Sequence, residues 1–391
     1  MVIRSFLPVG QGAFYCEQFY EDDHKDRRVN VVYDCGSSTN VKLVETQIAN
    51  MFYEGEHIQA LFISHLHDDH INGIPFLLRY CQVEKIFFPL ITPKNAIYIK
   101  LYNMMANETD SFSSSFAENP VSAIEELHLE YSPRLIQISE DRQDHDSKSN
   151  SEIFDSAIHD LPIIDSGKDV SSEIFDQEMR VKNSDCGKWI FIPFNFTQVG
   201  RVKKLQETLN SASYFGRNMN NADLTNIWKN GSDQDREKIM AAYKAVRGSL
   251  NTNSMTLYSG INLSDYNLHI CKSLCINNYL RCKCDYDGWQ VGCLYMGDYD
   301  ASGKNKWKKL YESYKEYWKS IGCVQIPHHG SYHNYNKKLA TLNAWCIISV
   351  GTQNMYRHPS SSVINDLLFN GRCLHLVTEK AKSEMHFCIY I

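Results

Sequence analysis

The stretch SHLHDDH, from Ser64 to His70, places three histidines and two aspartates in its last six positions, directly after the apolar run IQALFI. Imidazole and carboxylate groups are rarely buried without partners, so the stretch is either a solvated loop or a metal site. On an extended chain His65 and His67 project to the same side, and Asp69 and His70 then turn toward a second position. This donor set suits Zn²⁺, Mn²⁺ or Fe²⁺, and the absence of cysteine favours an open hydrolytic site over a structural zinc.

Further candidate groups stand at the ends of other predicted strands. Asp298 follows the strand of CLYMGDYD, and the pair His328–His329 follows that of VQIPHHGS. Strands of this kind alternate with amphipathic helices, such as the one predicted from Val41 to Phe52, which argues for an α/β architecture. The polar strand ends could then meet at one edge of a sheet.

The middle of the chain differs in composition from both ends. Residues from about 107 to 185 are rich in Ser, Asp, Glu and Asn. We therefore expect one domain over residues 1–391, with its core from about 1–94 and 250–391 and with 95–250 as an insertion or accessory region. Within that region KWIFIPFNF predicts a strand, and Asp233 to Arg247 predicts a helix capped by Ser232.

Composition limits the function classes. The chain has 40 basic and 46 acidic residues and a net charge of −6, so the protein as a whole does not attract nucleic acid electrostatically. A local basic cleft on an acidic protein could still bind nucleic acid. The sequence offers no run of about 18 apolar residues that could span a membrane, and no signal-peptide pattern. Thirteen cysteines, an odd number in apolar surroundings, fit reduced thiols. We therefore expect a cytoplasmic protein without a membrane partner.

Taken together, HLHDDH and the later motifs resemble the metallo-β-lactamase superfamily. The resemblance implies an αββα sandwich whose metal ligands come from loops along one edge of two sheets. The segments LPVGQGAFY, NTNSMTL, IPHHGS and SVGTQNMYRHPSSSVI also resemble the hydrolase domain of competence-type DNA-uptake proteins. That branch implies phosphodiesterases or nucleases. The resemblance covers roughly residues 1–90 and 250–391 and does not cover the middle.

The resemblance implies two divalent ions, Zn or Mn, and assigns roles to residues. Asp69 would bind metal and orient the nucleophile, Asp34 would hold the ligand loop, and His328 and His358 would complete the catalytic set. Adjacent residues at a strand end point to opposite sides, so we expect one histidine of the pair to bind metal and favour His329. The predicted ligands are His65, His67, Asp69, His70, Asp298 and His329.

One departure from the family pattern concerns the first metal. Many members carry a third histidine in a turn ahead of the bridging aspartate. Here the corresponding turn is SLNTNS, which places Asn251 near that position. An amide is a weaker ligand than imidazole, so we expect a looser first site, built from His65, His67 and Asp298, at which Mn²⁺ is at least as active as Zn²⁺.

Substrate contacts are predicted from the same motifs. By family position His358 would lie beside the metals, with Asn354, Tyr356 and Arg357 near the substrate, and Ser331 is also expected to contact the substrate. Taken alone, His358 before a proline is more often a turn residue than a catalyst. A basic rim for a phosphate backbone is predicted around the bridging aspartate, although a solvated helix face is the alternative; its lysines are Lys306, Lys309, Lys337 and Lys338.

Four cysteines cluster in CKSLCINNYLRCKC, with spacing that matches no strong zinc pattern. Packing on one β-hairpin is the simpler interpretation, and an additional structural zinc is the alternative. These cysteines are Cys271, Cys275, Cys282 and Cys284.

The sequence therefore predicts a dinuclear metal-dependent phosphodiesterase, most simply a nuclease acting on nucleic acid. The long polar insertion raises the hypotheses of a protein partner bound through residues 95–250 and of an effector in a multi-component prokaryotic defence system. The alternatives are a hydrolase of a small ester, thioester or lactone, and a non-catalytic effector or sensor module on the same fold.

Overall fold

The structure is a computed structural model of the chain. It describes residues 1–20, 28–91, 111–141, 160–175, 189–196, 199–219, 221–245, 254–261, 273–277, 280–282 and 290–389.

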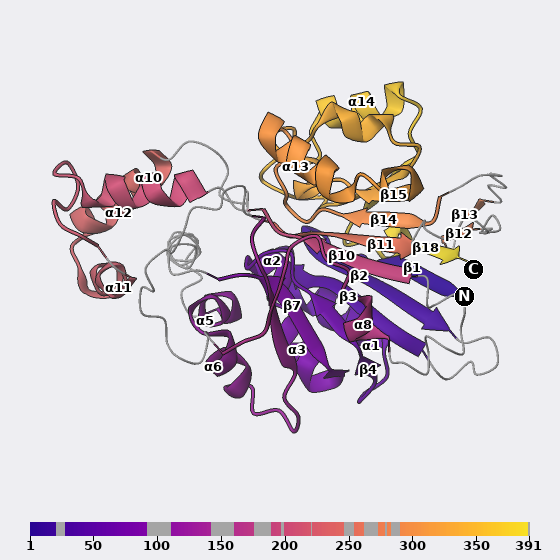
Figure 1. Cartoon of the computed structure of the whole chain (residues 1–391), viewed down its shortest axis with the longest axis horizontal. Coiled ribbons are helices and arrows are strands. Elements are labelled where there is room, and N and C mark those ends of the chain that lie inside the picture. Colours follow the sequence, from indigo (N-terminus) through magenta and orange to yellow (C-terminus); the bar gives the residue numbers. More distant parts are fainter. Residues whose placement is uncertain are drawn as a thin grey trace.

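Two sheets lie face to face and form the centre of the molecule (Figure 1). The first has ten strands in the order β13-β12-β18-β1-β2-β3-β5-β7-β8-β9. Its strands are β1 (Val2–Phe6), β2 (Gly12–Tyr20), β3 (Arg28–Ser37), β5 (Ala60–Phe62), β7 (Lys85–Pro89), β8 (Arg134–Ile138), β9 (Ile163–Ile164), β12 (Ser273–Asn277), β13 (Leu280–Cys282) and β18 (Met385–Ile389).

The second sheet has six strands in the order β10-β11-β14-β15-β16-β17. The strands from β14 to β17 pair in parallel, and β10 and β11 extend them in antiparallel fashion. The strands are β10 (Trp189–Phe194), β11 (Thr256–Ile261), β14 (Gly292–Tyr295), β15 (Ile321–Gln325), β16 (Trp345–Ser349) and β17 (Leu374–Val377). A separate two-stranded ladder joins β4 (His57–Ile58) to β6 (Gln82–Val83).

Helices cover the outer face of each sheet (Figure 1). The first sheet carries α1 (Val41–Met51), α2 (Asp68–Ile71), α3 (Ile74–Tyr80), α5 (Phe112–Glu118) and α6 (Pro120–Glu125). The second carries α13 (Lys304–Tyr314) and α14 (Ser361–Phe369). The remaining helices are α8 (Ser171–Ile174), α10 (Val199–Asn210), α11 (Asn221–Asn230), α12 (Asp233–Ala245), and the 3₁₀ turns η2 (Trp318–Ser320), η3 (His328–Gly330), η4 (Lys337–Thr341) and η5 (Ala381–Ser383). The predicted αββα sandwich is confirmed.

Three apolar clusters hold these layers together. Tyr33 of β3 and Tyr295 of β14 lie in the core between the sheets. Val32, the residue before Tyr33, belongs instead to the cluster that includes Ile48 of α1. This period-two alternation is what a strand buried on both faces requires. Leu310 of α13 belongs to the third cluster, on the outer face of the second sheet.

The predicted insertion, residues 95–250, contributes to both sheets. It supplies β8 and β9 at one end of the first sheet and β10 at one end of the second. KWIFIPFNF forms β10, as the sequence predicted. The same segment also supplies α10, α11 and α12, which pack around a small core of their own and stand at the left of Figure 1.

Local signals place several helix boundaries. Asn40 caps α1 by accepting from the backbone N–H of Lys42 at 3.0 Å. Ser232 accepts from the N–H of Asp235 at 3.2 Å, which is the predicted cap of α12. Helix α13 ends at Tyr314 and gives way to a turn and η2.

A buried ion pair on the first sheet lies in the core between the two sheets. Arg4 of β1 contacts Glu17 of β2 at 2.6 Å, and both side chains are almost fully buried. The guanidinium also donates to the carbonyl oxygens of Val291 and Ser259 on the facing sheet, at 2.9 and 3.4 Å. Glu17 in turn accepts from the hydroxyl of Tyr295 at 2.8 Å. The network therefore links the two sheets by polar contacts inside an otherwise apolar layer.

Two further predictions concern particular segments. Within the described part of the chain, no helix is both long and apolar enough to cross a membrane. The cysteine-rich segment forms the predicted hairpin at the level of its backbone, with Cys275 opposite Cys282 in β12 and β13. The side chains of Cys271, Cys275, Cys282 and Cys284 lie outside the described structure.

Candidate metal centre

The HLHDDH segment runs from the end of β5 into α2. Ile63 still bonds to β7, and the chain then leaves the sheet so that His67 immediately precedes α2. A Cβ placed at Gly36 would lie 2.6 Å from backbone atoms of Asp69 and His70, so only glycine lets β3 approach this turn. Asp298 and His329 reach the same point from loops after β14 and β15 of the other sheet. The candidate site therefore lies at one edge of the sandwich.

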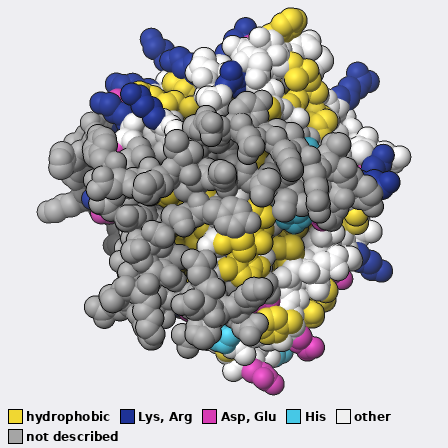
Figure 2. Space-filling model, turned by 90° about the vertical axis from the view of Figure 1, so that its right-hand side faces the viewer, with side chains coloured by type: hydrophobic (Ala, Val, Ile, Leu, Met, Phe, Trp, Pro, Cys, Tyr) yellow, Lys and Arg dark blue, Asp and Glu magenta, His cyan; other side chains and the backbone are white. Residues whose placement is uncertain are grey.

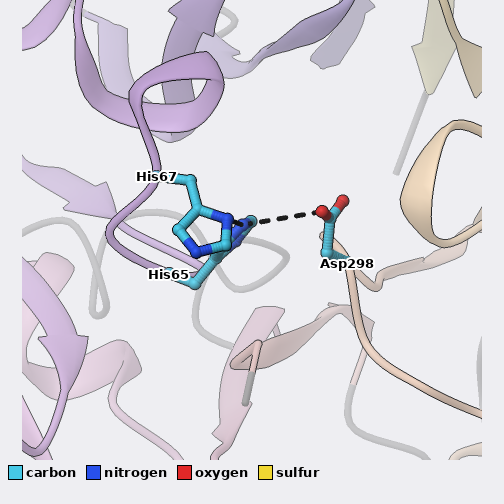
Figure 3. A group of neighbouring side chains, drawn as sticks. All are labelled: His65, His67 and Asp298. Carbon is cyan, nitrogen blue, oxygen red and sulfur yellow. Dashed lines mark hydrogen bonds and ion pairs between the residues drawn. The ribbon is translucent and has the colours of Figure 1, made fainter. Parts of the chain in front are cut away.

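One donor set joins His65, His67 and Asp298, which lie close enough to hold a single ion. The Nε2 atom of His65 is 3.1 Å from Nδ1 of His67 and 3.6 Å from Oδ2 of Asp298. Figure 3 shows the two imidazole rings on their loop, with His65 directed at the carboxylate of Asp298 from the opposite side.

A second donor set uses the other oxygen of the same aspartate. Nε2 of His70 lies 3.4 Å from Oδ1 of Asp298 and 3.8 Å from Oδ2 of Asp69. Nε2 of His329 lies 3.2 Å from Oδ2 of Asp69. The residues His70, Asp298 and His329 are all buried and also lie close enough to share one ion. Asp298 therefore faces both donor sets at once.

These groups fit a bound divalent metal. Two ligands at the usual zinc bond lengths in a tetrahedron lie about 3.3 Å apart, close to the separations within both sets. Nε2 of His70 is buried and has no hydrogen-bond partner among the described residues, a costly state for a nitrogen unless an ion occupies its lone pair. Histidines and aspartates without cysteine suit Zn²⁺ or Mn²⁺.

The outer nitrogens of the ligating histidines are oriented by fixed acceptors. Nδ1 of His70 donates to Oδ2 of Asp34 at 2.8 Å, and Nδ1 of His329 donates to the carbonyl oxygen of Ser349 at 2.8 Å. Asp34 also accepts from the backbone N–H and hydroxyl of Ser64, both at 2.7 Å. Each contact directs the Nε2 lone pair toward the centre, which is how outer contacts tune metal ligands.

Electrostatics at the site follow from burial and from the mixture of charges. Burial alone would raise the pKa of Asp298, but His328, His70 and His65 hold it well below its usual range. Burial alone would lower the pKa of His70, but Asp69, Asp34 and Asp298 raise it well above its usual range. Burial lowers the pKa of His67 to about 4, so this ring is neutral and able to ligate at pH 7.

We expect Asp34→Asn to weaken metal binding by about 10- to 100-fold without unfolding the protein. Asp34 has a positive φ of 58°, which asparagine tolerates, but an amide N–H₂ cannot accept the proton of His70 Nδ1. His70 would then present N–H, rather than its lone pair, toward the centre. Competition titration against a chromogenic chelator measures the effect.

A matched control is Asp233→Asn on α12, where the carboxylate is 93 % exposed. It should leave metal affinity unchanged. Equal affinity in Asp34→Asn and the parent protein would show that Asp34 does not orient His70.

The pair His328–His329 corrects one step of the sequence argument. Opposite directions were predicted because a strand end was assumed, but both residues lie in the η3 turn and have positive φ, 50° and 53°. Both rings therefore turn toward the centre, His329 to Asp69 and His328 to Asp298, with Nε2 of His328 3.6 Å from Oδ2 of Asp298. Nδ1 of His328 donates to Oδ1 of Asn334 at 2.8 Å. The favoured ligand, His329, lies in the second donor set, and His328 remains 20 % exposed.

The loop after β16 brings His358 next to the centre. The ring centroids of His358 and His328 are 5.5 Å apart, and burial lowers the pKa of His358 to about 4. Two residues that were predicted to contact the substrate, Asn354 and Ser331, are respectively bonded within this loop and buried. The amide of Asn354 donates to the carbonyls of Gly351 and His358 and accepts from the N–H of His358, so it holds the loop, and Ser331 is only 2 % exposed.

The basic rim requires a larger correction. Lys306 is buried, 1 % exposed, and pairs with Asp300 at 3.1 Å, so it cannot contact a substrate backbone. Lys309 pairs with Asp141 at 2.8 Å and is 13 % exposed. Lys337 and Lys338 remain exposed. Figure 2 shows the side of the molecule on which the two termini lie, and there the described lysines and arginines are scattered along the border of the view rather than gathered in one patch.

Two groups near the centre were not singled out from the sequence. The hydroxyls of Ser64 and Ser254 lie 2.9 and 3.3 Å from Nδ1 of His65, and Ser254 also accepts from the N–H of Asp298 at 3.0 Å. A serine offers no distinctive pattern in sequence, and only its burial marks it. Asn251, predicted to stand near the missing third histidine, lies outside the described residues.

The sandwich and the histidine–aspartate centre at its edge define a metal-dependent hydrolase fold. The family model of the metallo-beta-lactamase superfamily matches residues 25–94, which include Asp34 and the whole HLHDDH segment. This match supports the superfamily predicted from the motifs.

Two further comparisons were made. Among solved structures, the crystal structure of MEM-A1, a subclass B3 metallo-beta-lactamase isolated from a soil metagenome library, is similar with 10% identity and a TM-score of 0.29. That likeness covers 83% of this chain and 77% of MEM-A1, and at this TM-score it carries no weight of its own. A search of curated proteins gives no match.

Proposed function

We propose that the chain is a dinuclear metal-dependent phosphodiesterase that acts on nucleic acid. The observation that carries the proposal is the position of Asp298, whose Oδ2 faces His65 and whose Oδ1 faces His70. A carboxylate shared in this way is suited to bridge two ions. Ions held by these residues would supply positive charge for both the attacking and the leaving oxygen of a displacement at phosphorus.

The chain's own residues then divide the remaining work. When bound, divalent ions acidify water and withdraw electron density from a phosphoryl oxygen. The carboxylate of Asp69, which lies beside His329 and His70, can accept a hydrogen bond from the attacking water and orient it. His328 is partly exposed while its Nε2 faces Asp298, so it can contact a substrate oxygen or donate a proton to the leaving oxygen. His358, beside it, is placed to contact the substrate.

The preference for phosphodiesters rests on the resemblance of IPHHGS and MYRHPSSS to the competence-type branch. A hydrolase of small esters, thioesters or lactones is the second candidate, and the ion pairs of Lys306 and Lys309 favour it because they remove charge from the expected rim. A protein partner bound through residues 95–250, and with it an effector role in a prokaryotic defence system, stays a proposal. The lobe of α10, α11 and α12 is its proposed surface.

We expect about two ions per chain by elemental analysis, and loss of hydrolysis when a chelator removes them. Without ions the buried donors have no means to acidify water, so turnover should return only when Mn²⁺ or Zn²⁺ is added back. The assay compares bis(p-nitrophenyl) phosphate, single-stranded and duplex DNA, and RNA with p-nitrophenyl acetate and a lactone. Hydrolysis of the ester or lactone alone would favour the second candidate. Metal-loaded protein without any turnover would favour a non-catalytic module.

A further inference from the structure

An exposed aromatic ring stands beside the metal centre on the loop between β16 and α14. Tyr356 is 63 % exposed, and its neighbour Met355 is 86 % exposed. Adjacent exposed apolar side chains next to a site are available for contact with a bound molecule. Both occur at the tip of the loop that also carries His358.

The loop that presents this ring is fixed by hydrogen bonds. The side chain of Asn354 closes it by bonding to Gly351 and to both backbone groups of His358, at 2.8 Å in each case. At its far end the N–H of Ser360 donates to the carbonyl of Gly330 at 3.0 Å, and the N–H of Tyr332 donates to the hydroxyl of Ser360 at 3.2 Å. The backbone of the loop that carries Tyr356 is therefore fixed relative to the η3 turn, which limits the ordering that binding requires.

A series of rings leads from the bridging carboxylate to the surface. His328 lies against Asp298, the ring of His358 follows 5.5 Å further out, and the ring of Tyr356 stacks on His358 at 6.0 Å with an interplanar angle of 16°. Exposure rises along this series, from 1 % for Asp298 to 20 % for the His328 side chain and 63 % for Tyr356. A substrate whose phosphate lies at Asp298 would pass over Tyr356 as it leaves the site.

The basic rim beside the metal centre is weaker than the sequence predicted. The chain carries a net charge of −6, and Lys306 and Lys309 are neutralised by Asp300 and Asp141. Duplex DNA is gripped mainly through cationic contacts to phosphates, whereas single strands also bind through stacking of bases on aromatic rings. The exposed Arg357, next to Tyr356, adds one cation to the same tip.

We infer that Tyr356 is a stacking platform for an unpaired nucleobase next to the scissile phosphate, and that the substrate is a single-stranded nucleic acid. This inference rests on the proposed phosphodiesterase function and narrows its substrate class. Bases inside a duplex are already stacked on both faces, so they offer no free face to Tyr356 unless they unpair. Stacking of this kind tolerates every base, so sequence preference should be small.

The test compares two single-stranded oligomers of equal length and charge, oligothymidylate and an oligomer of abasic phosphodiester units. The metal-loaded wild-type protein should cleave oligothymidylate with a kcat/KM about 5- to 150-fold higher, the range that corresponds to about 1–3 kcal/mol per stacked base. Tyr356→Ala should bring this ratio close to one. Tyr356→Trp should preserve it, since an aromatic face remains. Thermal melting confirms that each variant is folded.

Tyr53, which follows α1 and is 64 % exposed, provides the matched control, and Tyr53→Ala should keep the wild-type ratio. A duplex of oligothymidylate with oligoadenylate should be cleaved more slowly than the single strand. If the wild-type protein hydrolyses bis(p-nitrophenyl) phosphate but shows a ratio of one, or if Tyr356→Ala keeps the ratio, the stacking inference is overturned alone. If the protein hydrolyses no phosphodiester, the proposed function falls and the inference falls with it.

Discussion

Asp69→Asn is expected to reduce hydrolysis by several orders of magnitude while the protein stays folded. The carboxylate of Asp69 lies 3.2 Å from Nε2 of His329 and 3.8 Å from Nε2 of His70, so it belongs to the second donor set. An amide carries no charge, binds a divalent ion weakly, and cannot orient an attacking water as a carboxylate does. Turnover of bis(p-nitrophenyl) phosphate and metal content measured on the same samples test this expectation.

The neighbouring aspartate of the same motif is the matched control. Asp68 is in none of the described groups that could hold an ion, and burial raises the pKa of its carboxyl group. Asp68→Asn changes the sequence by the same atoms one position away and should keep both activity and metal. Full turnover in a folded Asp69→Asn variant, or equal losses in both variants, would place the chemistry elsewhere.

Arg4→Met is expected to lower the free energy of unfolding by about 3–5 kcal/mol, although Arg4 is remote in sequence from every candidate ligand. The change removes the guanidinium that contacts Glu17 at 2.6 Å and leaves that carboxylate buried in the layer between the sheets. Loss of one partner of a buried pair costs far more than the pair contributes, because the remaining charge is stranded. Urea unfolding followed by tryptophan fluorescence measures the difference.

A surface pair of the same residue types gives the comparison. Arg134 contacts Glu173 at 2.9 Å, and these side chains are 52 % and 30 % exposed. Arg134→Met should cost no more than about 1 kcal/mol, because water solvates the remaining carboxylate. Similar losses in the two variants would mean that the Arg4 network contributes no more than an ordinary surface pair.

The parts of the site that sequence could predict are those coded by local spacing. His65, His67, Asp69 and His70 fall within six positions, so one turn of chain brings them together whatever the rest of the fold does. Asp298 could be predicted because it follows a strongly apolar strand, and strand ends of a sandwich meet at an edge. For both groups the pattern and the structure agree.

The parts that sequence could not predict depend on backbone conformation and on distant partners. The direction of the His328 ring follows from the positive φ of His328 and His329. Residues other than glycine rarely adopt this backbone conformation, and nothing in the sequence indicated it here. Lys306 looked solvated because its neighbours are charged, but its partner Asp300 and its burial come from tertiary packing. The strands β8 and β9 were hidden by the polar composition around them.

The pairing of β1 with β18 affects how the chain can fold while it is being synthesised. Val2 lies opposite Ile389, so one edge of β1 obtains its hydrogen-bond partners only after Ile389 has been made. At a translation rate of about 5–20 residues per second, β18 leaves the ribosome roughly 20–80 s after β1. During that interval the open edge can pair with another nascent chain, because unpaired strand edges are templates for aggregation. Slower initiation, or a chaperone that shields nascent strands, should therefore raise the yield of folded protein more than any change at the metal centre.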